Sequence, residues 1–363
     1  MRIAFILPHF GTGGAERVAS LLCNYWVEQG HLVTAITFEA PGTRSAHPLD
    51  NSVVRCQTDV LNRSQALLSR LAINARRLSR IRSTIKASEP DVIVAFTTEA
   101  NVVALWSAFG LGIPVIVSER NQPDRPGLGR WRHLARRITY PMAAGVVVQT
   151  ETIAKWAKQR FRVPVHVLPN PVRLSAQPEV REDSQAAKRV VAVGRLVRQK
   201  GFDLLIESFA RIAARHPNWT LAIYGEGDER TALEAQIRCS SCADRIKLPG
   251  VCNEIEKVYA DAGLFVLPSR FEGYPNALLE ALAAGCPVVA TNCPGASSEI
   301  LDGGRYGLLV EPENVGALTL ALDRMLSRED LRARFANQAR KAVSELDVAN
   351  VGSRWLGLFS SLP

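Results

Sequence analysis

The sequence lacks the cysteine pattern of a disulfide framework. Its 363 residues include seven cysteines, an odd number at irregular spacings. Cys239 and Cys242 form one CxxC pair, but no second pair or histidine cluster follows at zinc-finger spacing. This cysteine pattern excludes two classes of protein: a small fold held together by disulfides and a zinc finger. We expect reduced thiols in a cytoplasmic protein.

Long apolar runs are also lacking. The run after Arg2 is too short for the h-region of a secretory leader, and no small-residue cleavage site follows it, so we expect no leader. Residues 100–118 carry no charge and are long enough to span a bilayer, but Gly110, Gly112 and Pro114 interrupt them. We predict a helix, a turn and a buried strand here rather than a membrane span.

Acidic residues are scarce in the first half of the chain. The net charge is +9, and residues 1–175 hold 22 Lys/Arg against 11 Asp/Glu, whereas residues 176–363 hold 22 against 24. The basic character therefore belongs to the first half. It favours a polyanionic partner there, such as nucleic acid, an anionic membrane surface or a phosphorylated acceptor.

Residues 61–88 concentrate this charge, with seven basic residues and no acid. On a helix, leucines and isoleucines would form one apolar stripe, with Arg63, Arg70 and Arg77 along its flank. Such a face would attract anionic lipid head groups or a lipid diphosphate. A solvated helix that packs by its apolar stripe is an equal alternative. A nucleic-acid-binding helix is another, although no known module or aromatic-interleaved basic run supports it.

Short runs rich in Val and Ile alternate with helical stretches along the whole chain. Continuous apolar runs are typical of strands covered on both faces of a parallel sheet. We therefore predict an α/β fold of two Rossmann-like doubly wound domains that face each other across a cleft. The domains would span 1–175 and 188–346, and a helix at 347–363 could pack back on the first domain. The predicted strands lie at 2–8, 31–38, 91–96, 114–119, 145–150 and 164–169, and then at 189–194, 219–225, 245–250, 263–268 and 287–291.

Ligands of such sheets bind in the loops that follow the carboxyl ends of the strands. After the first predicted strand, GTGGAE opens a helix, and Gly13 and Gly14 would let the backbone approach a ligand. A dinucleotide-binding GxGxxG would need glycine or alanine where Glu16 stands. An NAD-dependent oxidoreductase using this loop is thus a weakened alternative, and a plain strand-to-helix turn is another.

The loop after the strand at 189–194 carries two cations. Arg195 and Lys200 follow Gly194 and could clamp a diphosphate, because each forms charge-assisted bonds to phosphate oxygens. Two predicted strands further along the chain, Gly250 ends the strand at 245–250 and Val251 follows it. Glycines at successive loops of this kind indicate a ligand that lies along one edge of the sheet.

The stretch SRFEGYPNALLEALAAG, residues 269–285, places two glutamates around a predicted helix start. Glu272 precedes the helix and Glu280 lies inside it. A helix N-terminus carries about half a positive charge, so an anion there is favourable. Carboxylates accept hydrogen bonds from sugar hydroxyls, so the two glutamates would contact sugars on either side of a bound phosphate group.

Three motifs together resemble a retaining glycosyltransferase of the GT-B fold and family 4 type. They are GGAER near the start, VGRLVRQKGFD at 193–203, and SRFEGYPNALLEALAAGCPVVAT at 269–291 with its E-x7-E spacing. With SERN at 118–121, the chain is similar to the subgroup that extends polyprenyl-diphosphate-linked oligosaccharides. The resemblance, which covers nearly the whole chain, implies transfer of an N-acetylhexosamine or hexose from a UDP-sugar to a lipid-diphosphate-linked saccharide. It places the enzyme in glycan or polysaccharide assembly, as a peripheral protein on the cytoplasmic membrane face.

The resemblance also implies roles for individual residues. Arg195 and Lys200 neutralise the donor diphosphate, Glu272 contacts the donor sugar, and these three are assigned to catalysis. Glu280 accepts from the ribose hydroxyls. The remaining donor contacts would be made by backbone groups. Gly194 lies in the loop with Arg195 and Lys200, and the backbone of Gly273, Tyr274, Pro275 and Asn276 would hold the sugar and phosphate. Gly250 and Val251 would contact the base, and Gly13 and Gly14 would cover the diphosphate. The family needs no metal or other cofactor, and the sequence has no DxD motif at a suitable loop.

The acceptor side departs from the family pattern. Many members carry a histidine in the loop after the fourth or fifth strand, where this chain has Glu119, Arg120 and Asn121. His9 and His133 are not clear substitutes. We expect as partners a nucleotide sugar, a lipid-linked saccharide and an anionic membrane surface, and no nucleic acid.

Overall fold

The computed structural model describes residues 1–59, 67–120, 130–174, 188–252, 254–293 and 295–362. The chain forms two compact units. Unit 1 comprises Met1–Pro171 with Val348–Pro363, and unit 2 comprises Val172–Asp347. Each unit has its own parallel sheet and its own hydrophobic cores.

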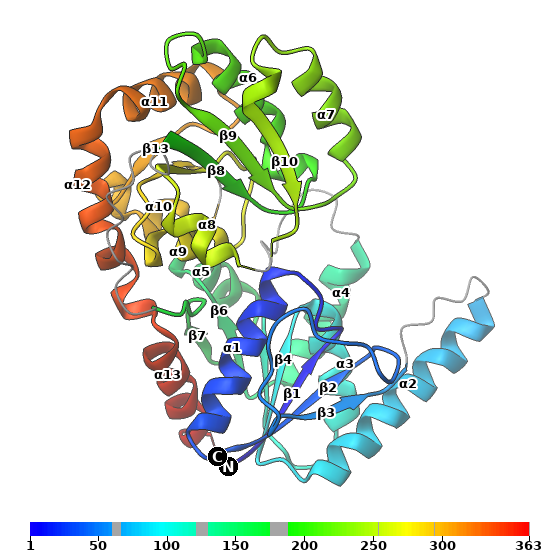
Figure 1. Cartoon of the computed structure of the whole chain (residues 1–363). Helices are drawn as coiled ribbons and strands as arrows, with labels where there is room; N and C mark the ends of the chain where they lie inside the picture. The colour runs from blue at the N-terminus through cyan, green and yellow to red at the C-terminus, as the bar shows by residue number, and fades with distance from the viewer. Residues whose placement is uncertain (60–66, 121–129, 175–187, 253, 294, 363) are drawn as a thin grey trace. The chain divides into compact units, whose positions relative to one another are not determined.

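The sheet of unit 1 is parallel throughout, in the order β3-β2-β1-β4-β5-β6-β7 (Figure 1). Its strands are β1 Arg2–Leu7, β2 Leu32–Thr37, β3 Val54–Gln57, β4 Val92–Phe96, β5 Val115–Ser118, β6 Gly145–Val148 and β7 Val165–Val167. The helices of this unit include α1 Gly14–Glu28, α2 Leu67–Ser88, α3 Thr98–Ala108, α4 Arg130–Thr139, α5 Glu151–Arg160 and α13 Val348–Ser360.

Successive side chains of β1 face two different cores, because strand side chains alternate between the faces of a sheet. Phe5 packs in the core that contains Trp26 of α1 and Trp355 of α13. Ile6 packs in the opposite core, with Ile81 of α2. The rings of Trp26 and Trp355 meet edge to face at 6.2 Å. The last helix of the chain thus lies beside α1 within unit 1, in dark red next to blue in Figure 1.

The sheet of unit 2 is also parallel, in the order β10-β9-β8-β11-β12-β13. Its strands are β8 Arg189–Val193, β9 Thr220–Tyr224, β10 Ile246–Gly250, β11 Leu264–Leu267, β12 Val288–Thr291 and β13 Leu308–Val310. The helices include α6 Phe202–Ile212, α7 Arg230–Arg238, α8 Ile255–Ala260, α9 Asn276–Ala283, α10 Ser297–Ile300, α11 Val315–Ser327 and α12 Glu329–Ala339. Ala192 of β8 faces the core with α6 and α11, and Val191 faces the core with α9.

The predicted α/β class with two doubly wound parallel sheets is confirmed. Two strands were not predicted, β3 and β13, and both lie at sheet edges. β3 reads VRCQ and is at most half-buried, and β13 has only three residues. An edge strand pairs on one side and needs no continuous apolar run, so its sequence carries little signal.

The uncharged stretch 100–118 contains α3 from its third residue onward, a turn and the buried strand β5, as the sequence predicts. Across the described ranges, no helix is both long enough and apolar enough to span a bilayer. The chain passes between the units at Pro171/Val172 and again at Asp347/Val348.

Candidate active site

The strand order of unit 2 creates a topological switch point between β8 and β11. From β8 the sheet continues to β9 on one side and to β11 on the other, so the loops after β8 and β11 diverge toward opposite faces. Ligands of doubly wound sheets bind in the crevice between such loops. Both loops carry predicted residues: Arg195 and Lys200 follow β8, and Glu272 follows β11.

Lys200 and Glu272 meet directly at this switch point. Lys200 Nζ lies 2.6 Å from Glu272 Oε1, and the Ser269 hydroxyl donates to the same oxygen at 2.6 Å. Glu272 is only 5% exposed, and the aliphatic part of Lys200 lies against Gly194. The residue predicted for the diphosphate and the residue predicted for the sugar therefore hold each other in place. Ser269, at the end of the strand, completes the pair and was not singled out from the sequence.

Arg195 is an exposed cation of the same loop. Within the described part of the chain its guanidinium has no recorded ion pair. It can therefore form bidentate bonds to phosphate without first breaking a protein contact. Gly201 brings the two loops together: its φ is +66°, and a Cβ there would collide with the carbonyl oxygen of Pro268.

Helix α9 begins at Asn276 with Pro275 as its N-cap, at the position that the sequence predicts. The backbone from Gly273 to Asn276 thus leads into the positive end of a helix dipole. One turn inside, the Glu280 carboxylate accepts a hydrogen bond of 3.1 Å from the Tyr259 hydroxyl. This places both predicted glutamates on the loop and helix that follow β11.

Tyr259 is a positioning residue that the sequence does not reveal. It belongs to α8, is 1% exposed, and packs edge-on against Phe265 with the ring centroids 5.6 Å apart. Its ring is fixed by this packing, so its hydroxyl can fix the direction of the Glu280 carboxylate. Nothing in the sequence around Tyr259 distinguishes it from an ordinary core tyrosine.

Arg270 anchors the loop that carries Glu272. Its guanidinium donates to both carboxylate oxygens of Asp203 at 2.8 and 2.7 Å, to Glu313 at 2.9 Å, and to the carbonyl of Arg198 at 2.8 Å. Burial acts to raise the pKa of Asp203, but the hydrogen bonds and charge of Arg270, together with backbone N–H groups at the start of α6, hold that pKa below its usual value. Arg270 is thus a structural cation within the motif, in contrast to Arg195.

The loops after β8, β9 and β10 pack through their backbones. The Gly225 N–H donates to the carbonyl of Gly250 at 2.8 Å, and a Cβ on Gly225 would collide with the carbonyl of Gly194. Val251, next to Gly250, is 62% exposed. These residues lie along the same carboxyl edge as the cation loop. Their contact with a nucleotide base stays a prediction.

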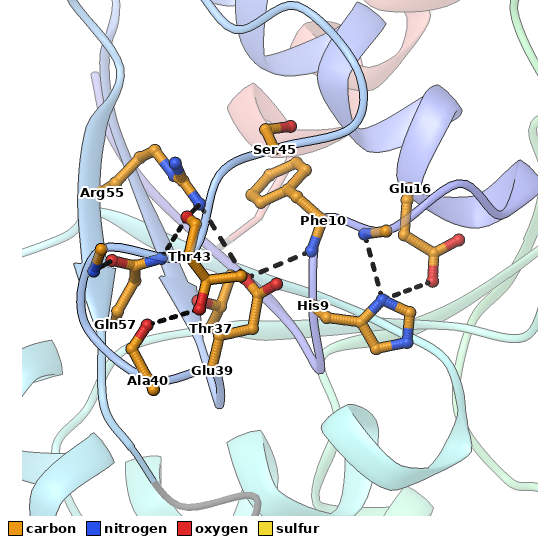
Figure 2. A network of polar contacts seen from close by, with 12 residues as sticks. His9, Phe10, Glu16, Thr37, Glu39, Ala40, Thr43, Ser45, Arg55 and Gln57 are labelled. Carbon is orange, nitrogen blue, oxygen red and sulfur yellow. Dashed lines mark hydrogen bonds and ion pairs between the residues drawn. The ribbon is translucent and has the colours of Figure 1, made fainter.

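In unit 1, a polar network holds the loop after β1 (Figure 2). The Phe10 N–H donates to the buried carboxylate of Glu39, 3.3 Å away at the end of β2. His9 Nδ1 accepts from the Gly11 N–H at 3.1 Å and lies 3.5 Å from Glu16 Oε1. The loop after β1 is therefore held by Glu39, beyond the end of β2, and by Glu16 of α1.

This network weakens the dinucleotide alternative further. Gly13 is the N-cap of α1, and a Cβ on it would collide with the Glu16 carboxylate, so the protein places its own acid at this helix start. Glu39, the acid that a Rossmann fingerprint would turn toward a ribose, is bonded to the backbone instead. The contact of Gly13 and Gly14 with a diphosphate stays a prediction.

Glu119 lies in a buried polar cluster just beyond β5. It accepts two hydrogen bonds from Arg136, Nε to Oε1 at 2.8 Å and Nη2 to Oε2 at 3.0 Å, and the two side chains are 1% and 2% exposed. The Tyr140 hydroxyl donates to the same carboxylate and accepts from Asn101 at 2.9 Å. Burial and the neighbouring Glu119 charge raise the pKa of Tyr140. Glu119 is thus the anchor of helix α4.

Arg120 is also buried. Its guanidinium stacks on Phe96, 3.6 Å from the ring centroid, and donates to Asn170 at 2.5 Å. Burial lowers the pKa of this guanidinium, and Nε and Nη2 have no partner among the described residues. Asn121, the third residue predicted for the acceptor side, lies outside the described residues.

The basic helix predicted at 61–88 corresponds largely to α2. Arg63 and the side chain of Arg70 lie outside the described residues. Arg77 pairs with Glu99 at 2.9 Å and stacks on Phe38. In the same described segment, Arg80 donates to the carbonyls of Thr58 and Asp59, Arg82 donates to those of Ser107 and Phe109, and Leu78, Ile81 and Ile85 pack on a core. The described part of α2 thus matches the alternative of a packed helix.

Two adjoining family models together match residues 12–342 of the chain. Glycosyltransferase Family 4 matches residues 12–176, and Glycosyl transferases group 1 matches residues 176–342. The chain is a GT-B glycosyltransferase of the family 4 type. This family membership argues against the two alternative functions, a nucleic-acid-binding protein and an NAD-dependent oxidoreductase. No group of three or more His, Cys, Asp or Glu side chains in the described ranges could hold a metal ion.

This glycosyltransferase has full-length relatives. It is 25% identical over 363 residues, covering 100% of the chain and 99% of the relative, to the "GalNAc-alpha-(1->4)-GalNAc-alpha-(1->3)-diNAcBac-PP-undecaprenol alpha-1,4-N-acetyl-D-galactosaminyltransferase" of Campylobacter jejuni. Sucrose-phosphate synthase from Thermosynechococcus elongatus has a TM-score of 0.86 at 17% identity, with 99% and 98% of the two chains covered. Anabaena HepE in complex with UDP has a TM-score of 0.80 at 20% identity, with 100% of both chains covered. These two structures show the fold.

Proposed function

We propose that this glycosyltransferase moves a sugar from a UDP-sugar to a lipid-diphosphate-linked saccharide, with retention at the anomeric carbon. The observation that carries the proposal is the Lys200–Glu272 pair at the switch point of unit 2, in the same loops as Arg195 and the start of α9. A cation, a carboxylate and a helix N-terminus on one edge suit a sugar linked to a diphosphate.

The known relatives support the two substrates. The Campylobacter jejuni relative is named for an acceptor linked through PP to undecaprenol and for an N-acetylhexosamine donor. HepE was crystallised with UDP. We propose an N-acetylhexosamine, or else a hexose, as the sugar, in glycan or polysaccharide assembly. Because such an acceptor is anchored in a membrane, we place the enzyme as a peripheral protein on the cytoplasmic membrane face.

The chemistry follows from where charge develops. Breaking the bond between the anomeric carbon and the UDP oxygen leaves negative charge on the departing diphosphate. Arg195, Lys200 and the N-terminus of α9 would stabilise that charge in a preorganised way. Glu272 would accept from hydroxyls of the donor sugar and Glu280 from those of the ribose. No residue is assigned as a covalent nucleophile, and the departing phosphate would take the proton of the acceptor hydroxyl.

Arg195→Ala tests the cation clamp most directly. Because the Arg195 side chain is exposed, the variant should keep the melting temperature of the native protein. Loss of a preorganised cation at the leaving group should lower kcat by about 10²–10³-fold. UDP release in the presence of acceptor measures this. Arg198→Ala, an exposed arginine in the same loop, is the matched control and should keep its rate. Near-normal turnover of Arg195→Ala would contradict the assignment.

The same assay tests the proposal that no metal is required. With the diphosphate held by two cations and a helix dipole, EDTA should leave the initial rate within about twofold of the untreated enzyme, and added Mg²⁺ should not raise it. A rate that collapses with EDTA and returns with Mg²⁺ would show that the clamp needs a metal.

A further inference from the structure

Helix α4 buries a charged side chain and exposes three large apolar ones. Arg136 is 2% exposed, whereas Trp131, Leu134 and Ile138 are 59%, 58% and 55% exposed. With 3.6 residues per turn, the three apolar residues fall within an arc of about 60° on the side of the helix opposite Arg136. We refer to Trp131, Leu134 and Ile138 as the α4 stripe. A surface helix normally has the reverse arrangement.

The anchoring of α4 explains why the stripe stays exposed. Arg136 forms the buried two-point ion pair with Glu119, and its Nη2 also donates to the Thr98 hydroxyl at 2.9 Å. Tyr140, directly after the helix, donates to the same carboxylate. Rolling the helix to bury its apolar side would leave two buried charges unpaired, which is strongly unfavourable. The fold therefore imposes the outward apolar side.

The charge around the stripe is of one sign. The helix sequence RWRHLARRIT contains four arginines and no acid. Arg132 and Arg137 are exposed, and the Arg132 guanidinium lies 5.4 Å from the centroid of the Trp131 ring. An exposed Trp-Leu-Ile stripe with arginines beside it is typical of a helix that lies in the surface of an anionic bilayer. There the apolar residues enter the acyl boundary, Trp favours the interface, and Arg contacts lipid phosphates.

The position of α4 fits a membrane-anchored acceptor. Arg136 contacts Glu119, just beyond β5, and Thr98, just beyond β4, so the helix is fastened at the carboxyl edge of the sheet of unit 1. Doubly wound sheets bind their ligands at that edge. The diphosphate of a lipid-linked saccharide lies at the membrane surface. A bilayer that presents it must therefore approach this same edge.

We propose that the α4 stripe, with Arg132 and Arg137, docks this enzyme on an anionic lipid bilayer. The inference rests on the proposed transfer to a lipid-linked acceptor and names the surface that reaches the membrane. It differs from the expectation for residues 61–88, because three arginines of α2, Arg77, Arg80 and Arg82, bind protein groups and the described apolar residues of that helix are packed, which leaves Arg76 exposed there.

Co-sedimentation of the full chain with vesicles tests the proposal. We would compare phosphatidylcholine vesicles with and without phosphatidylglycerol. The native protein should bind the anionic vesicles, and W131S/L134S/I138S should lower the partition coefficient by about tenfold or more. R132Q/R137Q should lose the preference for anionic over neutral vesicles. The matched control is W106S/F109S, an aromatic pair at the end of α3 in the same unit, 46% and 64% exposed. It should bind as the native protein does.

Two results with the triple variant would overturn the proposal, and a third with W131F. One is equal vesicle binding by the native protein and W131S/L134S/I138S. The other is a native dimer in light scattering that this triple variant converts to a monomer, which would identify a second copy of the chain as the cover of the stripe. If the triple variant melts at a lower temperature, W131F replaces it: brominated lipid should quench the fluorescence of the native protein, and W131F should remove that quenching. Unchanged quenching in W131F would also overturn the proposal.

Failure of the proposed function would be recognised separately. Sugar transfer is measured once with acceptor in vesicles and once with acceptor in detergent. The triple variant should lose transfer in vesicles by about tenfold and keep it in detergent. If the native protein transfers no sugar in either format, the proposed function is wrong, and the sedimentation result still decides whether α4 binds lipid.

Discussion

Tyr259 and Glu280 illustrate how a residue predicted to contact the donor depends on a side chain outside its own motif. The Glu280 carboxylate is oriented by the Tyr259 hydroxyl, 3.1 Å away, and the tyrosine ring is buried against Phe265. Lys200 does the same for Glu272 from the other loop. In both cases a motif carboxylate obtains its direction from a side chain that lies elsewhere in the sequence.

Tyr259→Phe should therefore weaken donor binding more than turnover. The change removes one hydrogen bond to a carboxylate while the ring stays packed, so KM for the UDP-sugar should rise by about threefold to tenfold, with kcat within about twofold. Steady-state kinetics measure both constants. Tyr306→Phe, a half-buried tyrosine in the same unit, is the control. A fall in kcat at constant KM would show that Glu280 acts on the reacting sugar and not on the ribose.

Among the elements, the loop between β11 and α9 depends on its tie to α6. Arg270 joins this loop to Asp203 in the first turn of α6 and to Glu313. The loop carries Glu272, so the tie holds the carboxylate that we predict to contact the donor sugar beside the cation loop. The contact between Lys200 and Glu272 therefore depends on the cation loop after β8, the loop after β11 and the start of helix α6.

This tie predicts a dependence of stability on pH. The pKa of Asp203 is lower in the folded protein than in the unfolded chain, so its contribution is complete above the unfolded pKa of about 3.9 and is lost as the pH falls through the folded value. The melting temperature of the native protein should therefore fall more steeply below about pH 5 than that of Asp203→Asn. Asp244→Asn, an exposed acid in the same unit, should follow the native curve. Parallel curves for native protein and Asp203→Asn would contradict this.

At the scale of the whole molecule, the last helix belongs to the first unit. Trp355 is fully buried between α1 and the sheet, within 6.2 Å of the Trp26 ring and 5.9 Å of the Phe96 ring. The Tyr25 hydroxyl and the Ser353 hydroxyl are 2.6 Å apart and add a polar contact. Completion of unit 1 therefore needs a segment that is synthesised after all of unit 2.

Trp355→Ala should destabilise unit 1 selectively. The cavity left by a fully buried tryptophan costs about 3–5 kcal/mol. Hydrogen exchange in β1 should become faster, while exchange in β8 should change little because that strand lies in the other unit. Met325→Ala, a fully buried residue of α11 in unit 2, should show the opposite pattern. Equal acceleration in β1 and β8 by Trp355→Ala would show that the two units unfold together.

The sequence by itself determined the local features. Apolar runs identified β1, β8 and β11, and the start of α9 between Glu272 and Glu280 was predictable because helix starts depend on neighbouring residues. The motifs also identified the family, since the residues predicted for the donor site lie in short contiguous stretches. The edge strands were not predicted: β3 is at most half-buried and needs no apolar run, and β13 has only three residues.

Only the tertiary structure decided which charged side chains bind other protein groups and which stay exposed. Lys200 and Glu272 are 72 positions apart, and nothing local shows that they pair while Arg195 stays exposed. The basic helices α2 and α4 look alike in charge, but Arg77, Arg80 and Arg82 of α2 bind protein groups, whereas α4 buries Arg136 and turns its apolar stripe outward. Charge is a property of composition, whereas its availability to a ligand depends on partners that folding brings together from distant parts of the chain.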